Sequence, residues 1–251
     1  GNVTEAVLNW GGNFSDKLFI GVNIGIQSIM YKYEERFSEE ALNSADFQSG
    51  FSYFSYGYRY KATGTGINLK AGFIYLPANW LRVGASISTP TWMYLSEEWE
   101  NGVNSEFNDG YMQRMVSPLG TYNYRLNTPF RWNVGAAVLL GGRGVISADY
   151  ESVDYTKAKF KDADYEFGYD VENSDIRKLF TKQNILRLGA ELNVNPAVAV
   201  RAGYQHYSSP YSGNSSEGER KVGSLGLGYV CPWGASDFFV DLTYQQLLQK
   251  T

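Results

Sequence analysis

Carboxylate and guanidinium side chains recur at alternate positions in several segments of the sequence. Asp149 and Glu151 alternate with apolar residues in one segment, and Arg187 and Glu191 do so in another. Because successive side chains of a strand point to opposite faces, each segment turns its charges to one side. Such charges could line a water-filled bore, where they pair with one another or orient the carboxylate of an amphiphilic ligand. The expected bore residues are Lys70, Arg82, Asp149, Glu151, Arg187, Glu191, Arg201 and Asp241.

An apolar aromatic cluster is a second candidate site. It consists of Trp92, Met93, Tyr94 and Leu95, followed by Trp99, at the start of what we expect to be a long extracellular loop. Apolar residues on an exposed segment often mark a binding surface, so the cluster could receive a hydrophobic substrate. An interfacial aromatic girdle, which is common in membrane barrels, explains the same residues.

Covalent catalysis and metal binding have little support. His206 lies close to Ser208 and Ser209, as an outer-membrane phospholipase would need, but no acid or oxyanion motif accompanies them. The sequence holds one histidine and one cysteine, Cys231, which are too few for a zinc or haem site. We therefore expect no enzyme, no catalytic residue, no metal and no cofactor.

The composition narrows the class of partner. The formal net charge is -4 and no basic stripe is present, which argues against nucleic acid. No run of about eighteen apolar residues exists, so no transmembrane helix is expected. Aromatic residues make up 16% of the chain, and 27 glycines are scattered through alternating segments. Aromatic girdles combined with small bore-facing residues produce such a mixture.

The elements that must position these residues are long strands. Ten segments alternate apolar and polar residues with period two, most clearly over 18–26. Each is about 9 to 13 residues long, enough to cross the hydrocarbon layer at a tilt of roughly 45°. Short links follow the odd-numbered segments and long polar links follow the even-numbered ones, as in outer-membrane barrels. The sequence therefore predicts one domain over 1–251, an all-β, antiparallel, up-and-down transmembrane β-barrel.

The long polar links are expected to be extracellular loops. They cover 33–52, 91–121, 157–183 and 208–219. The first could hold a helical turn over 38–42. In the third, residues 173–175 can cap a short helix that ends near 179–180.

Strand parity suggests that the barrel extends beyond this sequence. If the short turns are periplasmic, ten strands leave both ends of the chain on the extracellular side. Single-chain barrels of this type usually keep both termini in the periplasm, so we expect truncation at both ends. Residues 247–251 also lack the terminal aromatic residue that such barrels commonly carry.

Three segments resemble a known family. They are GTGINLKAGFIYLPANWLRVGASISTPTW (64–92), ISADYESVDYTKAKF (146–160) and NILRLGAELNVNPAVAVRAGYQHYSSPY (184–211). They resemble the FadL-type outer-membrane transporters of long-chain fatty acids and aromatic hydrocarbons, particularly versions from Bacteroidetes. The resemblance implies a fourteen-stranded barrel with an N-terminal hatch, and lateral release of substrate through a kinked strand. Three strands missing before this chain and one after it would fit that total, and the hatch would be missing too.

These observations predict a channel in the bacterial outer membrane for passive uptake of hydrophobic small molecules. The protein would be a monomer surrounded by membrane lipid or detergent. Two alternatives stay open: a soluble lipocalin-like ligand-binding barrel, and a structural or adhesive outer-membrane barrel. Alternation alone does not say which face is outside. The direction of the apolar side chains in 18–26 and 186–192 distinguishes the first alternative.

Overall fold

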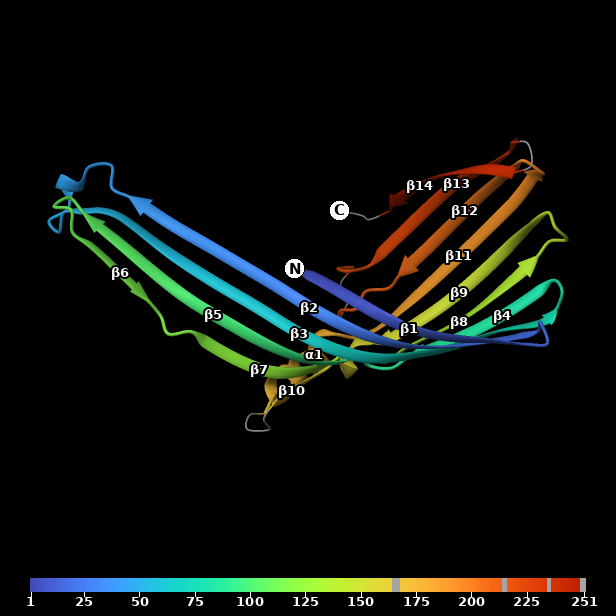
Figure 1. Ribbon diagram of the computed structural model, residues 1–251, viewed down its shortest axis with the longest axis horizontal. Coiled ribbons are helices and arrows are strands. Elements are labelled where there is room, and N and C mark those ends of the chain that lie inside the picture. Colours follow the sequence, from blue (N-terminus) through green and yellow to red (C-terminus); the bar gives the residue numbers. More distant parts are fainter. Residues whose placement is uncertain (164–167, 214–215, 234–235, 249–251) are drawn as a thin grey trace.

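The computed structural model describes residues 1–163, 168–213, 216–233 and 236–248 as one long antiparallel sheet (Figure 1). The chain begins with β1 (Asn2–Phe14), followed by the two longest strands, β2 (Leu18–Glu40) and β3 (Phe51–Ala78). The others are β4 (Leu81–Ser88), β5 (Trp92–Phe107), β6 (Met112–Val116), β7 (Gly120–Asn127), β8 (Arg131–Leu139), β9 (Gly144–Asp154), β10 (Lys159–Asp162), β11 (Lys182–Asn195), β12 (Val198–Tyr207), β13 (Arg220–Trp233) and β14 (Ser236–Leu247).

The sheet is up-and-down and is not closed. Neighbouring strands are antiparallel throughout, while β1 pairs only with β2 and β14 only with β13. The strand segments follow the ten expected strands. The count is larger because β5 and β6 lie in the link expected over 91–121, the fifth expected strand comprises β7 and β8, and β10 lies in the link expected over 157–183. The predicted antiparallel, up-and-down strand order is confirmed.

The two faces of the sheet differ in polarity. Leu186 and Leu188 are exposed on one face, which we call the outer face, at 38% and 44%. Ile24 and Ile26 are likewise exposed on this face, at 39% and 50%. Next to these residues, the opposite face carries charged side chains that pair across neighbouring strands, and we call it the bore face. None of the described segments packs over the apolar side chains of the outer face. This distribution therefore favours contact between the outer face and lipid.

Two of the expected long loops contain long strand segments. β2 continues to Glu40 and pairs with β3 from Tyr53 onward, which leaves only a short turn with a 3-10 helix at Ser44–Asp46. The helical turn expected over 38–42 is therefore wrong. Most of 91–121 forms β5 and β6, so the loop expected there is wrong too. A polar sequence can still form a strand where the strand meets water, because ion pairs between neighbouring strands stabilise the sheet.

The third long link contains the predicted short helix, α1 (Asp170–Leu179). It begins earlier than the expected cap at Asn173, whose side chain is buried instead. The Asn173 Nδ2 donates to the Phe160 carbonyl at 2.9 Å, and the Phe160 amide donates to Asn173 Oδ1 at 2.8 Å. Asn173 thus ties α1 to β10. Within the described residues, no helix is long and apolar enough to cross a membrane.

Two Thr-Pro dipeptides interrupt adjacent strands at the same level. Residues 89–91 separate β4 from β5, and residues 128–130 separate β7 from β8. β4 pairs with β8 and β5 with β7, so the two breaks lie side by side. A third break follows in the next strand, where a 3-10 helix (Tyr155–Lys157) stands between β9 and β10. Figure 1 shows the sheet bending where these segments meet.

Threonine hydroxyls take over hydrogen bonds at the breaks. Proline has no N–H to give to a ladder. The Leu69 amide donates to Thr89 Oγ1 at 3.0 Å, and the Thr91 amide donates to Thr128 Oγ1 at 2.8 Å. The side chain that precedes each proline therefore accepts a main-chain N–H that would otherwise lack a partner.

Candidate functional site

The bore face becomes aromatic in the long-loop half of the sheet. Because paired residues of neighbouring strands share a face, the register places aromatic side chains from several strands on this side. We call this surface the inner aromatic wall. Its residues are Tyr31 and Tyr33 (β2), Tyr58 and Tyr60 (β3), Trp99 (β5), Tyr122 and Tyr124 (β7), Phe160 (β10), and Tyr169, which precedes α1.

Ring contacts link much of the wall. Tyr60 meets Tyr31 edge-on with centroids 6.0 Å apart, and it stacks on Tyr58 at 6.5 Å. Tyr124 stacks on Tyr122 at 6.2 Å and contacts Phe160 at 5.8 Å. Offset and edge-to-face pairs at these separations are the favoured geometries for aromatic rings. The wall therefore offers a flat ligand many ring faces and edges that are already held in place.

Glu97 lies between the two groups of rings. The Tyr124 hydroxyl donates to Glu97 Oε1 at 2.7 Å, and Tyr60 also interacts with this carboxylate. Burial raises the pKa of Tyr60 and of Tyr124 above the ordinary value, and Glu97 raises both further. Both phenols are therefore protonated donors at neutral pH. The carboxylate holds the β3 and β7 tyrosines together from β5.

Trp99 packs against a glycine of the neighbouring strand. It stands in register with Gly120 of β7, and a Cβ at residue 120 would overlap the indole ring. Only glycine leaves this space free. The absence of a side chain at 120 thus allows the indole to lie across β7 as part of the wall.

The structure separates the aromatic cluster predicted from sequence. Its five residues lie on strand β5, so alternate members face opposite sides. Trp92 and Tyr94 are exposed on the outer face, at 45% and 44%. Met93, Leu95 and Trp99 face the bore, where Leu95 is buried. Only Trp99 belongs to the inner aromatic wall, while Trp92 and Tyr94 stand where a girdle residue would stand.

Seven of the eight expected bore residues form ion pairs on the bore face. Arg187 donates to Asp149 Oδ1 and to Glu151 Oε2, both at 2.7 Å. Glu151 is buried and also pairs with Arg131 at 2.6 Å. This cluster joins β8, β9 and β11. Since its charges neutralise one another, it stabilises the wall of the bore.

The other charges form two separate groups. Arg201 pairs with Glu191 at 2.6 Å and with Asp241, which joins β11, β12 and β14. Lys70 pairs at 2.9 Å with Glu5 of β1. Arg82 is exposed, and no carboxylate of the described residues lies within ion-pair distance of it. It is therefore the expected bore residue with charge left over for a ligand.

Sequence analysis missed Glu5, Arg131 and most of the inner aromatic wall. Arg131 stands two residues before Asn133 on the bore face of β8, so period-two counting from that strand could have found it. The tyrosines of 53–60 alternate in the same way, but their partner segment, 33–40, was assigned to a loop. Without that pairing, the tyrosines have no aromatic neighbours.

Comparison with known proteins gives a likeness in fold. No family model and no curated protein matches the sequence. CymD, a monoaromatic hydrocarbon channel, is 14% identical with a TM-score of 0.53, over 97% of this chain and 69% of that one. The Pseudomonas putida toluene transporter TodX is 13% identical with a TM-score of 0.55, over 96% and 62%.

A FadL homologue from Pseudomonas aeruginosa shares the fold as well. It is 15% identical with a TM-score of 0.62, over 98% of this chain and 59% of that one. The chain thus spans between 59% and 69% of the length of these three structures. The expected FadL-type strand arrangement is confirmed.

Proposed function

We propose that this chain forms part of the wall of a bacterial outer-membrane channel for passive uptake of hydrophobic small molecules. The main observation behind this proposal is the difference between the two faces of the sheet. The outer face is apolar, and the bore face carries paired charges and, beyond them, the inner aromatic wall. The names of CymD and TodX, which describe a monoaromatic hydrocarbon channel and a toluene transporter, support this class of substrate. We further propose that the chain is a monomer surrounded by lipid.

The inner aromatic wall is where such a substrate would first bind. An aromatic hydrocarbon leaving water gains about 25 cal/mol for each Å² of apolar surface that it buries against the rings. Lower on the bore face, a cavity of about 710 Å³ lined by Phe19, Ile74 and Arg82 offers a second apolar surface. A hydrophobic molecule therefore concentrates on the wall, at the long-loop end, before it passes further.

Long-chain fatty acids are a second candidate class because of Arg82. This guanidinium lies on the bore face and is exposed, with no ion pair to any described carboxylate. A guanidinium can bind a carboxylate through two parallel hydrogen bonds. If fatty acids are the substrate, Arg82→Gln lowers their uptake and leaves that of toluene unchanged.

Uptake by cells that produce the full-length parent protein tests the proposal. Trp99→Ala removes a bore-face ring, and we expect toluene uptake to fall several-fold. Trp92→Ala is the matched control, because it removes the same side chain from the outer face of the same strand, and uptake should be unchanged. Equal uptake by wild type and Trp99→Ala, with both proteins in the outer membrane, would exclude the wall as the binding surface.

Two measurements distinguish the alternatives. A soluble ligand-binding barrel would stay in solution without detergent, whereas a channel with an apolar outer face requires detergent. An adhesive barrel would leave hydrocarbon uptake at the level of cells that lack the protein. Lipid hydrolysis that is lost in His206→Ala would instead indicate a phospholipase.

A further inference from the structure

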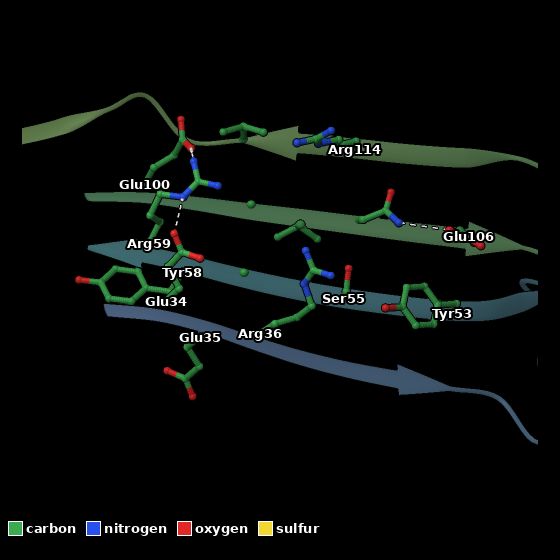
Figure 2. A pocket seen from close by; sticks show the side chains of 15 residues that line it. Glu34, Glu35, Arg36, Tyr53, Ser55, Tyr58, Arg59, Glu100, Glu106 and Arg114 are labelled. Carbon is green, nitrogen blue, oxygen red and sulfur yellow. Dashed lines mark hydrogen bonds and ion pairs between the residues drawn. The ribbon is translucent and has the colours of Figure 1, made fainter. Parts of the chain in front are cut away.

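The outer face carries a charged trough on the strands that extend beyond the aromatic girdle. A cavity of about 650 Å³ lies over β2, β3, β5 and β6 (Figure 2). Its floor is low because Gly57 and Gly102 stand next to each other in register, between Arg36 of β2 and Val116 of β6. Arg114 lies one row further along β6. We call this cavity the outer trough.

One arginine of the trough is already neutralised. Arg59 Nε lies 3.5 Å from Glu34 Oε1, and Arg59 Nη1 lies 3.6 Å from Glu100 Oε2. Figure 2 shows Arg59 between these two carboxylates. The three residues form a group at one end of the trough that carries a net charge of -1, so Arg59 has no positive charge left over for an anion.

Arg36 and Arg114 have no such partner. Among the described residues, no carboxylate lies within ion-pair distance of either guanidinium, and neither side chain donates a hydrogen bond. Glu106 also lines the trough without an ion pair among the described residues, and its Oε1 accepts from Asn104 Nδ2 at 3.3 Å. Glu35 also borders the cavity, but it accepts the Tyr33 hydroxyl on the bore side. Two unpaired cations therefore face one remaining carboxylate.

The trough lies on the same face as the lipid-facing side chains. Arg36 shares its face of β2 with Val22, Ile24 and Ile26, since all four are even-numbered residues of one uninterrupted strand. Along β5, Gly102 follows Trp92 by ten residues, which is about 33 Å of strand. At a tilt of roughly 45° this is about 23 Å above the girdle, beyond the lipid headgroups of an ordinary bilayer.

We infer that the outer trough binds a phosphate-bearing saccharide headgroup of an outer-leaflet glycolipid, held by Arg36 and Arg114. The inference rests on the proposed outer-membrane location. Guanidinium binds phosphate through parallel N–H···O bonds, and β2 and β6 are about 14 Å apart across three strand spacings. The two side chains can therefore hold one saccharide from opposite sides. The glycines leave room for its ring against the sheet.

Native mass spectrometry of the detergent-purified chain measures this binding. The probes are rough lipopolysaccharide with a phosphorylated inner core, the same material stripped of phosphate by hydrofluoric acid, and inorganic phosphate. For Arg36→Gln/Arg114→Gln we expect at least about a tenfold weaker affinity for the phosphorylated glycolipid. Lys17→Gln/Arg143→Gln removes the same charge at the short turns and should bind as wild type does.

Each outcome decides the question. A selective loss in Arg36→Gln/Arg114→Gln, with the stripped glycolipid binding weakly to both proteins, supports the inference. Equal affinity of that variant and wild type overturns it, as does equal binding of the stripped glycolipid. Inorganic phosphate that displaces the glycolipid from wild type at equal concentration would assign the site to free anions. Toluene uptake by the variant is measured in parallel, so a failure of the transport proposal is seen separately.

Discussion

At the scale of single residues, Glu151 is the most constrained charge on the bore face. It is 5% exposed and accepts from both Arg131 and Arg187. The carboxylate oxygens of Glu151 accept hydrogen bonds from both guanidinium groups, which water would otherwise accept. Removing it would leave two cations facing each other across β9.

Glu151→Gln should therefore destabilise the sheet more than Asp241→Asn does. We expect a loss of about 1–3 kcal/mol in the free energy of unfolding, because charge-assisted hydrogen bonds to partly buried partners are broken. Asp241 is solvent-exposed, so its loss should be smaller. Urea unfolding in lipid vesicles, followed by tryptophan fluorescence, measures both. Equal losses would contradict a special role for the buried carboxylate.

The tyrosines on Glu97 predict a distinct alkaline titration. The pKa of Tyr60 and of Tyr124 is raised above 10.0 in the folded state, first by burial and then by the carboxylate. Their stabilising contribution is therefore complete below pH about 10 and is lost as pH rises through the raised values. Tyrosinate absorbance of wild type should show a late phase that Tyr60→Phe/Tyr124→Phe reduces but does not abolish, because burial also raises the pKa of Tyr169. Glu97→Gln should move this phase to lower pH, and a curve unchanged in the double variant would disprove the assignment.

At the scale of elements, the Thr-Pro breaks rely on side-chain acceptors. Thr128→Val keeps the shape of the side chain but leaves the Thr91 amide without its 2.8 Å acceptor. We expect this amide to exchange with solvent about fivefold faster, since one hydrogen bond contributes about 1 kcal/mol. Thr121→Val, at an exposed position of β7, is the control and should leave exchange at 91 unchanged. Identical exchange in wild type and Thr128→Val would mean that the hydroxyl is dispensable.

The strand segments with one apolar face could be predicted from sequence, and the polar strand extensions could not. In 18–26 every second residue is apolar, which is a strong local signal. In 33–40 the pattern is almost wholly polar, and its strand pairing depends on contacts with 53–60, which are distant in sequence. The sequence predicts the short helix from local residues, but the expected cap is wrong: α1 begins at Asp170, and Asn173 bonds to Phe160 of β10.

The site shows the same limit. The charges of the bore were found because each lies inside a strand with clear alternation. The inner aromatic wall was missed because its rings come together only when β2, β3, β5 and β7 pair above the girdle. Glu97 gave no signal of its own, since a lone carboxylate in a polar segment looks like a solvated charge.

At the scale of the whole molecule, we expect the cost of a charged substitution on the outer face to depend on its depth in the bilayer. Leu188 lies in the middle of β11, and Leu192 lies on the same face near the turn at its end. An arginine costs about 2–4 kcal/mol at the bilayer midplane and about 0–1 kcal/mol near an interface. Leu188→Arg should therefore destabilise the vesicle-inserted protein far more than Leu192→Arg does. Similar small effects would indicate that this face meets water.

The three aligned breaks also have a mechanical consequence. β2 and β3 run without interruption past the breaks at 89–91, 128–130 and 155–157. These two strands are therefore stiffer than the neighbouring strands at the breaks. Thermal bending concentrates where the fewest hydrogen bonds resist it. The rings that β7 and β10 carry beyond these breaks are thus held less firmly than those on β2 and β3, and the ion-paired wall on the other side of the breaks keeps its shape.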